Sequence, residues 1–429
     1  MLSRIASAAL SLAPAVAAAH AFRERYDLPL PLSLWIGAAG LTVAASFALF
    51  AISPRRGVSS PRILLFQVHP VVIAVLRVLW FGLLCAIIAA GLFGTQDPFR
   101  NIVPAFVWIA WWIGFTYLCA VFGDLWSLVN PWKVVNPKGL FTLPRTVGAW
   151  PAAALFLAFA WIEIVWHDNA VPANIAWLAL GYSALTWAGM FLFGREAWLA
   201  GGEVFSVYFG FVARLAPLEW RADSELYLRA PAAGLLDPVP LSPSQAFFVV
   251  AMLATVTFDG LRETPLSPAG DLSWTVGLLT LPVLFALVLF AVCSFMKDES
   301  PGELLRLFAP TLLPIAIAYH VAHYLSYLLI AGQVVIPLAS DPLGRGWNLL
   351  GSAHYQVAAD IVGARFAWHT SVVVIVAAHV LAMYVAHRLA LERFADRRTA
   401  RRSQYPLAAL MVGYTMLSLW ILAQPVVEP

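Results

Sequence analysis

The sequence predicts an all-α protein, a polytopic transmembrane helix bundle with about ten spans after a signal peptide. The first observation is compositional: of 429 residues, 61% are hydrophobic and only 11% are charged. A soluble domain carries about 25% charged residues, so this chain cannot build a water-facing surface of the size it would need. The second observation is the alternation of long apolar runs with turn residues. The third is the gathering of Lys and Arg in every other loop.

The apolar runs have the length that a bilayer demands of a helix, about 20 residues. Each run is expected to be helical, because backbone groups in lipid have no water to bond and a helix satisfies them internally. The expected spans are 33–52, 70–93, 102–126, 150–166, 173–193, 245–261, 274–296, 309–332, 367–387 and 405–423.

The loops predict the orientation, because basic residues close to span ends stay on the cytoplasmic side. One set of loops holds most of the Lys and Arg, including the cluster from Arg388 to Arg402. Beyond the N-terminal segment, the opposite set holds Arg100, Arg262, Arg345 and Arg365. We therefore expect a multi-pass protein of the bacterial inner (cytoplasmic) membrane, with the mature N-terminus and the C-terminus outside.

Residues 1–19 have the pattern of a secretory signal peptide. They contain one charge, Arg4, then an apolar stretch too short to span a bilayer, and an AxA pattern that ends at Ala19. Cleavage there would make His20 the N-terminus, where an amine and an imidazole together chelate copper well. The alternative is an uncleaved amphipathic segment in which His20 is a loop residue.

The remaining residues, 20–429, are predicted to form a single transmembrane helical domain with two long connections. The segment near 195–217 is too apolar for a free loop and is broken by Gly201 and Gly202, so we expect it to be interfacial or re-entrant. The segment near 333–366 is rich in Pro, Gly and Asp, and we expect it to cap an outward-facing cavity.

Several function classes find no support. The net charge of +3 is not gathered on one face, so no nucleic-acid partner is expected. The cysteines Cys85, Cys119 and Cys293 each lie within an apolar run, which favours neither a disulfide framework nor a cysteine zinc site. Glycine-rich nucleotide loops, GxSxG elbows and HExxH motifs do not occur in the sequence.

Ionisable residues at membrane depth are costly and therefore mark candidate functional sites. His320 and His323 are three residues apart on one helix face, and His379 lies in the next span. At about 1.5 Å per residue, His320 lies roughly 16 Å from the inner end of its span, and His379 roughly 18 Å from the outer end of the antiparallel one. The three imidazoles are therefore expected at one level, with Asp259 somewhat nearer the outer face.

Neutral imidazoles suit zinc, copper or iron, so His320, His323 and His379 are predicted ligands of a divalent metal (Zn or Cu) or, as an alternative, of haem. Asp259 is the predicted catalytic group, as a general base or as the partner of a ligand. The competing interpretation is structural: each histidine can bond a nearby serine, tyrosine or backbone carbonyl.

Further candidates lie near the outer ends of spans. His369 is one of them. Glu163 and His167, one turn apart, form either a proton-handling pair or an internal salt bridge, of which the salt bridge is favoured.

Several phrases of the sequence together resemble one known family. They are DLPLPLSLW, NPWKVV, FGREAWLAGGEVFSVYFGFVARLAPL, TVTFDGL, AYHVAHYLSYLLIAGQVVIPLASDPLGRGW and AAHVLAMYVAHR. The resemblance is to the integral membrane proteins called fenitrothion hydrolase, and it runs over most of the chain after residue 19. It implies a multi-span bacterial membrane protein that cleaves the phosphorus to aryl-oxygen bond of an organophosphate or organophosphorothioate triester and releases a nitrophenol. It supplies no catalytic residues.

A small hydrophobic substrate of this kind partitions into the bilayer, where a metal-bound hydroxide is one way to attack it. Two other functions remain open. One is a copper- or haem-binding redox or metal-handling membrane protein, and the other is a transporter of small hydrophobic cargo. A second membrane subunit is a further open partner beside the lipid bilayer.

Overall fold

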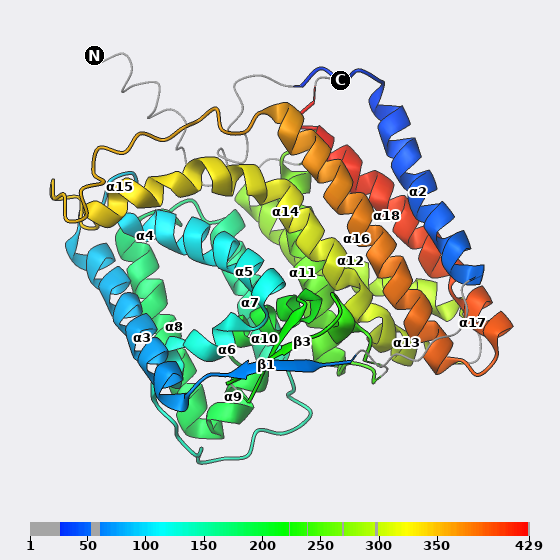
Figure 1. The fold of residues 1–429 in the computed structure, drawn as a ribbon, viewed down its shortest axis with the longest axis horizontal. Coiled ribbons are helices and arrows are strands. Elements are labelled where there is room, and N and C mark those ends of the chain that lie inside the picture. The colour runs from blue at the N-terminus through cyan, green and yellow to red at the C-terminus, as the bar shows by residue number, and fades with distance from the viewer. Residues whose placement is uncertain are drawn as a thin grey trace. The chain divides into compact units, whose positions relative to one another are not determined.

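The computed structural model describes residues 26–52, 61–222, 224–237, 239–267, 270–296 and 299–427. The predicted signal peptide, residues 1–19, and His20 lie outside the described residues. The described residues are mostly helical, which confirms the all-α class (Figure 1).

Within the described ranges, nine helical segments are long and apolar enough to cross a membrane. They are Leu32–Ile52, Pro70–Phe93, Ile102–Phe122, Pro172–Phe193, Pro243–Arg262, Asp271–Ser294, Pro301–Ser340, Ala364–Arg393 and Arg397–Ala423. All nine coincide with predicted spans. Their composition makes the chain a multi-pass membrane protein with a lipid bilayer around it.

The remaining predicted span, 150–166, is the helix α7, Trp150–Ile164, which has 15 residues. At about 1.5 Å per residue its length is about 22 Å, short of the roughly 30 Å of a hydrocarbon core. Its sequence begins with Trp-Pro and ends before Val165, where Asp168 and Asn169 follow in a turn.

The chain divides into two compact units, where the sequence suggested a single domain over residues 20–429. The described residues of the first unit lie within 62–229 and 326–362, and those of the second within 26–52, 230–325 and 363–427, together with residue 61. The helix α14, Leu312–Ala331, contributes to both, because the division falls at Leu325 and Ser326.

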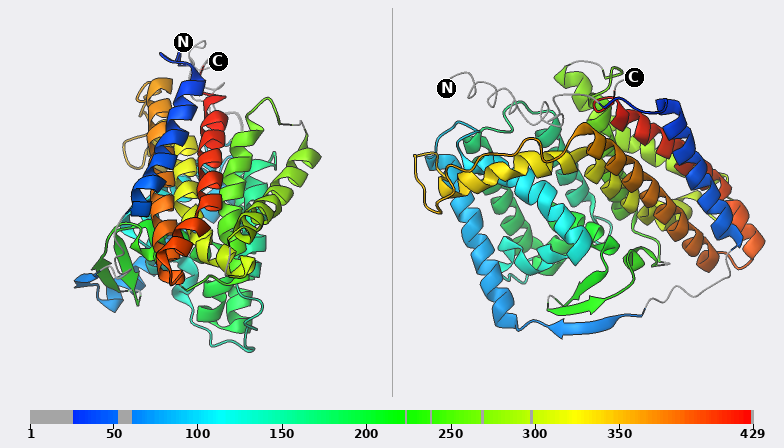
Figure 2. Two further views of the ribbon diagram at one scale, coloured as in Figure 1. Left: turned by 90° about the vertical axis from the view of Figure 1, so that its right-hand side faces the viewer. Right: turned by 45° about the horizontal axis from the view of Figure 1, so that its top comes forward.

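The second unit contains three long helices that lie side by side, as Figures 1 and 2 both show. They are α2 (Leu32–Ile52), α16 (Ala364–Arg393) and α18 (Tyr405–Ala423). Tyr26 pairs with Val427 and its amide donates to the carbonyl of Val426 at 2.9 Å, so the chain ahead of α2 and the chain after α18 are at the same end of this unit.

The second unit also contains the most buried helix, α11 (Pro243–Arg262), beside α12 (Asp271–Ser294). Helix α11 begins sharply because Ser242 and Gln245 form a capping box and Pro243 occupies the first helical position. Two short helices complete the unit, α13 (Pro301–Phe308) and α17 (Arg397–Ser403).

The first unit is built from α3 (Pro70–Phe93), a broken helix, α7 and α8 (Pro172–Phe193). The broken helix consists of α4 (Ile102–Pro104), a π-helical segment (Ala105–Phe115) and α5 (Thr116–Phe122). The short helix α6 (Leu125–Val129) and a 3-10 turn (Pro131–Val134) follow it.

The segment near 195–217 forms two short helices, α9 (Arg195–Gly201) and α10 (Val204–Val212), followed by a 3-10 turn, Ala213–Leu215. Nearly every residue of α10 is buried within the first unit. Its partial entry into the membrane stays a prediction. The segment near 333–366 has one short helix, α15 (Val335–Ser340), and then an exposed irregular stretch, whose capping role also stays a prediction.

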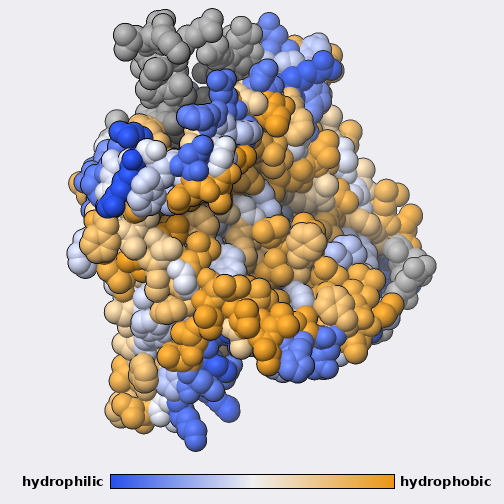
Figure 3. Space-filling view, turned by 60° about the vertical axis from the view of Figure 1, so that its left-hand side comes forward, coloured by the Kyte–Doolittle hydropathy of each residue, from blue (hydrophilic) through white to orange (hydrophobic). Residues whose placement is uncertain are grey.

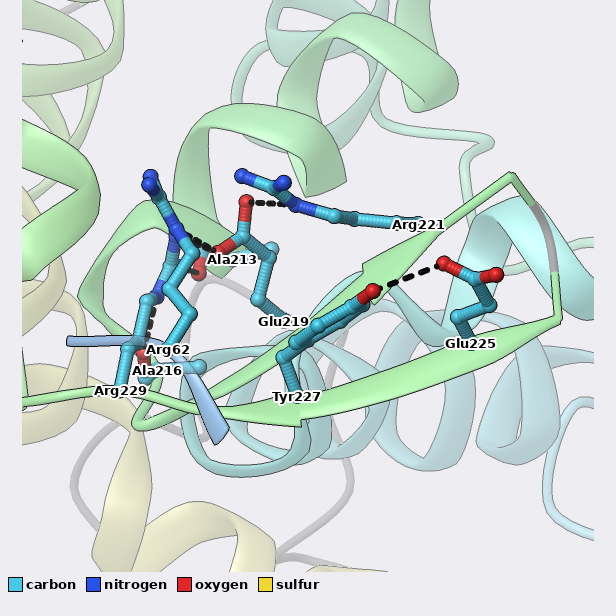
Figure 4. Close-up of polar contacts among 8 residues, drawn as sticks. All are labelled: Arg62, Ala213, Ala216, Glu219, Arg221, Glu225, Tyr227 and Arg229. Carbon is cyan, nitrogen blue, oxygen red and sulfur yellow. Dashed lines mark hydrogen bonds and ion pairs between the residues drawn. The ribbon is translucent and has the colours of Figure 1, made fainter. Parts of the chain in front are cut away.

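A small sheet in the first unit was not expected from the sequence. Its strands are β1 (Ile63–Gln67), β2 (Leu218–Arg221) and β3 (Glu225–Leu228), in the order β1-β3-β2 and antiparallel. The carboxylate of Glu219 on β2 accepts hydrogen bonds from two arginines (Figure 4). Arg62 donates to it at 2.7 Å, and Arg221 donates to it at 3.0 Å. Burial alone would raise the pKa of Glu219, but these hydrogen bonds and the charge of Arg229 lower it below its ordinary value.

Candidate functional site

The candidate site is a group of polar side chains in the second unit, carried by four membrane-spanning helices. Its first member is Asp259, on the last turn of α11, with a relative exposure of 8%. The helix around it is apolar and almost wholly buried. A carboxylate in such surroundings is costly unless it is hydrogen-bonded or paired.

Helix α14 supplies two partners to one oxygen of this carboxylate. The Nε2 atom of His323 lies 3.0 Å from Oδ2 of Asp259, and the hydroxyl of Tyr324 donates to the same Oδ2. The partners follow each other in the sequence, so a single turn of α14 holds both against α11.

His320 lies one turn before them on α14 and is also buried. Both histidine rings contact the ring of Tyr324. The ring centroid of His320 is 4.7 Å from that of Tyr324, and the ring centroid of His323 is 4.6 Å from it. The structure therefore brings together three of the predicted site residues, His320, His323 and Asp259. Tyr324, which the sequence offered only as a bonding partner for a buried histidine, is the residue that joins them.

His379 makes other contacts. Its Nδ1 is 2.8 Å from the carbonyl oxygen of Ile375 on its own helix, and its ring centroid is 5.9 Å from that of Tyr414 on α18. The side chain is completely buried, and among the described residues Nε2 has no hydrogen-bond partner. Tyr414 in turn shares a hydrogen bond of 2.5 Å with Thr257 of α11, two residues before Asp259.

Tyr319 packs against α11 through a glycine. A Cβ atom at Gly260 would lie 2.2 Å from the Tyr319 hydroxyl, so only glycine allows this approach. Tyr319 is fully buried, and its hydroxyl has no hydrogen-bond partner in the described ranges. The sequence signal for this contact is Gly260, which follows Asp259 in the phrase TVTFDGL. Of this pair, only the aspartate was predicted as a functional residue.

Metal ligation was the main prediction for these histidines. In the described parts of the chain, no group of three or more His, Cys, Asp or Glu side chains is placed so that it could hold a metal ion. His320 and His323 lie toward Tyr324 and α11, whereas His379 lies against Tyr414. A zinc, copper or haem cofactor stays a prediction, and no chemical step is assigned to one.

The other predicted residues lie elsewhere. The Nδ1 atom of His369 is 2.8 Å from the carbonyl oxygen of Arg365, and its ring is 5.7 Å from those of Tyr26 and Trp35, so it belongs to the aromatic end of the second unit. Glu163 and His167 belong to the first unit, and their internal salt bridge stays a prediction.

Sequence reasoning missed one buried carboxylate, Glu203, which caps α10 in the first unit. It is fully buried and accepts five hydrogen bonds. The donors are the Tyr182 hydroxyl (2.6 Å), the Ser206 amide (2.7 Å), the Phe205 amide (2.9 Å), the Trp126 indole (3.2 Å) and the Asn130 amide group (3.3 Å). The available sequence signal was the position of Glu203 directly after Gly201 and Gly202, which interrupt the apolar segment.

Comparisons of the chain with protein-family models, with curated proteins and with solved structures gave no match. Fold and site together define a multi-pass helical membrane protein in which a buried aspartate of one span contacts a histidine of another.

Proposed function

We propose that this protein is an integral membrane hydrolase that cleaves organophosphate or organophosphorothioate triesters. The observation that carries the proposal is the contact between Nε2 of His323 and Oδ2 of Asp259. When a carboxylate accepts a hydrogen bond from one nitrogen of an imidazole, the other nitrogen is available to accept a proton. Serine hydrolases use a histidine in this way. Both groups belong to spans, which is the environment of a neutral, apolar substrate.

The proposed reaction needs only these side chains and water. In this reaction the Nε2–H group of His323 donates a hydrogen bond to Asp259, so Nδ1 is the basic nitrogen. Nδ1 takes a proton from water while the water oxygen forms a bond to phosphorus. The bond from phosphorus to the aryl oxygen breaks, its electron pair leaves with that oxygen, and the imidazolium then protonates it to give the nitrophenol. Asp259 remains ionised and stabilises the imidazolium.

The resemblance of the phrases TVTFDGL and AYHVAHYLSY to the fenitrothion hydrolase family supports the substrate class, since these phrases contain Asp259, His320, His323 and Tyr324. The bilayer supports it as well. An uncharged triester concentrates among lipid chains, so a base at membrane depth meets it there.

The test is the release of nitrophenol from a nitrophenyl phosphotriester by the full-length protein in lipid nanodiscs. We expect turnover by the unaltered protein and its loss in His323→Ala. His369→Ala is the matched control, because the contacts of that histidine with described residues are to the backbone of its own helix and to the rings of Tyr26 and Trp35. Undiminished turnover in a well-folded His323→Ala protein would exclude the mechanism.

We propose the bacterial inner membrane as the location, with the mature N-terminus and the C-terminus outside. The alternation of Lys and Arg between loops supports this orientation. The pairing of Tyr26 with Val427 supports the placement of both ends of the second unit on one side of the membrane. A periplasm-dependent reporter enzyme fused after residue 429 should be active, and activity of a cytoplasm-dependent reporter would contradict the proposal.

A second candidate function is proton-coupled transport of small hydrophobic cargo. The observation that favours it is the series of protonatable side chains on successive helices: Asp259 with His323 and Tyr324, then Thr257 with Tyr414, and His379 against Tyr414. Such series carry protons in pumps and transporters. Proton entry into sealed proteoliposomes that Asp259→Asn abolishes would favour transport, and its absence in the unaltered protein would exclude it.

A further inference from the structure

The first unit contains a large apolar cavity of about 550 Å³. Its walls come from α3, the π-helical segment, α7, α8 and α10, all within residues 80–205. Pockets that hold small molecules have volumes of about 300–1,000 Å³. The cavity therefore has the size of a ligand site, and none of its lining residues belongs to the group around Asp259.

The lining is aromatic and carries no charge. Its rings include those of Trp80, Trp111, Trp126, Trp132, Phe159 and Phe205, and none of the Lys, Arg, Asp or Glu residues that the structure describes lines it. An ion or a phosphate headgroup would find no counter-charge here, which leaves an uncharged ligand. Aromatic walls favour ring-containing molecules, which gain edge-to-face or offset contacts beyond simple burial.

The inner wall is held in place by Glu203. This carboxylate accepts hydrogen bonds from the Trp126 indole and the Tyr182 hydroxyl, and both of these side chains line the cavity. Their polar atoms are thus occupied within the protein. Their rings also pack against other rings of the wall, with centroids 5.3 Å apart for Tyr182 and Phe205 and 5.8 Å apart for Trp126 and Trp132. A cavity with fixed walls loses little entropy when it binds a ligand.

Residues exposed on the outside of two spans form the rim. Leu83 of α3 is 36% exposed, and Trp177 and Leu185 of α8 are 64% and 44% exposed. Figure 3, in which the left-hand side of Figure 1 with α3 comes forward, shows a largely hydrophobic face. The rim thus opens where lipid chains surround the protein.

We infer that this cavity binds an uncharged, ring-containing lipophilic molecule that enters from the bilayer. This class of ligand fits all four features of the cavity, which are its size, its lack of charge, its aromatic walls and its lipid-facing rim. The inference is independent of hydrolysis at His323, because a molecule bound here needs no reacting group.

Two glycines allow a matched test. Gly181 of α8 lines the cavity, Gly82 of α3 does not, and a Cβ at either would meet no atom within 4 Å. Gly181→Phe should therefore fill the cavity, whereas Gly82→Phe adds the same side chain on a neighbouring helix outside it. Neither substitution should disturb folding, which a thermal unfolding curve checks.

The probe is 4-nitrobiphenyl, an uncharged ring compound that quenches tryptophan fluorescence on contact, titrated into the full-length protein in nanodiscs. We expect a saturable, static component for the unaltered protein and for Gly82→Phe, and its loss in Gly181→Phe, above a linear background from probe dissolved in lipid. A linear response of the unaltered protein overturns the inference. So does saturation retained in Gly181→Phe, or lost in both variants.

Discussion

The Nε2 atom of His323 lies 3.0 Å from Oδ2 of Asp259, and the Tyr324 hydroxyl donates to the same oxygen. Helix α14 thus places two consecutive side chains on one carboxylate of α11. Removal of any one member takes a hydrogen-bond partner from a buried polar group, which costs more than the net contribution of a typical hydrogen bond.

Asp259→Ala should lower stability substantially, because it leaves His323 and Tyr324 without their acceptor. Loss of one partner from a buried pair costs about 3–5 kcal/mol. The double variant Asp259→Ala/His323→Ala should lose less than the sum of the single variants, as thermal unfolding in nanodiscs would show. Additive losses would mean that the two side chains do not interact. Asp360→Ala, on the exposed irregular stretch after α15, is the control.

Gly260→Ala should destabilise the contact between α11 and α14, because the new methyl would lie 2.2 Å from the Tyr319 hydroxyl. Extra atoms in a packed core cost about 1–3 kcal/mol. Tyr319→Phe removes the nearest atom and should restore part of the loss. Gly413→Ala on α18, where a Cβ meets nothing within 4 Å, is the matched control. Equal melting temperatures for Gly260→Ala and Gly413→Ala would contradict the packing described.

The small sheet should loosen in acid. The folded pKa of Glu219 is lower than the ordinary value of 4.5. Its ionised form therefore stabilises the sheet above pH 4.5, and this contribution is lost as the pH falls through the folded pKa. The hydrogen-exchange protection factors of the β2 and β3 amides, which correct for the intrinsic pH dependence of exchange, should fall over that range, and Glu219→Gln should remove this change. The side chain is partly exposed, so high salt should weaken the effect. An unchanged pH profile in Glu219→Gln would show that another group controls the sheet.

Much of the fold is predictable because the bilayer imposes helices of a fixed length on apolar segments. The nine long segments follow that rule. The sheet does not, because β1 lies in a connection between spans, and its pairing with β3 joins Ile63 to Leu228, far apart in the sequence. The length of α7 also escaped prediction, since an apolar run does not reveal that its last residues form a turn.

The part of the site that depends on residue spacing along a helix was predictable from the sequence. Depth along the spans placed Asp259 only somewhat nearer the outer face than His320 and His323, and in the structure its carboxylate contacts His323. Depth says nothing about the direction in which a helix turns its side chains. His379 was expected beside the pair for that reason, but it lies against Tyr414. Glu203 and Gly260 depend on tertiary contacts that periodicity does not contain.

His379 distinguishes a three-histidine metal centre from a base formed by His323 and Asp259. The structure places its ring against Tyr414, so His379→Ala should retain both turnover and any bound metal, whereas His323→Ala loses turnover. Elemental analysis for zinc and copper and an absorbance spectrum in the Soret region measure the cofactor directly. Joint loss of metal and turnover in His379→Ala would instead establish the metal centre that the sequence predicts.

The most direct test of the central claim is the turnover number of Asp259→Asn with a nitrophenyl phosphotriester, measured beside its KM. The asparagine keeps the shape of the side chain but cannot stabilise an imidazolium. A positioned base contributes about 10²–10⁴-fold to a rate, so we predict a fall of that order in kcat with little change in KM. An undiminished kcat in a folded Asp259→Asn protein would contradict the assignment of His323 and Asp259 as the groups that carry the reaction.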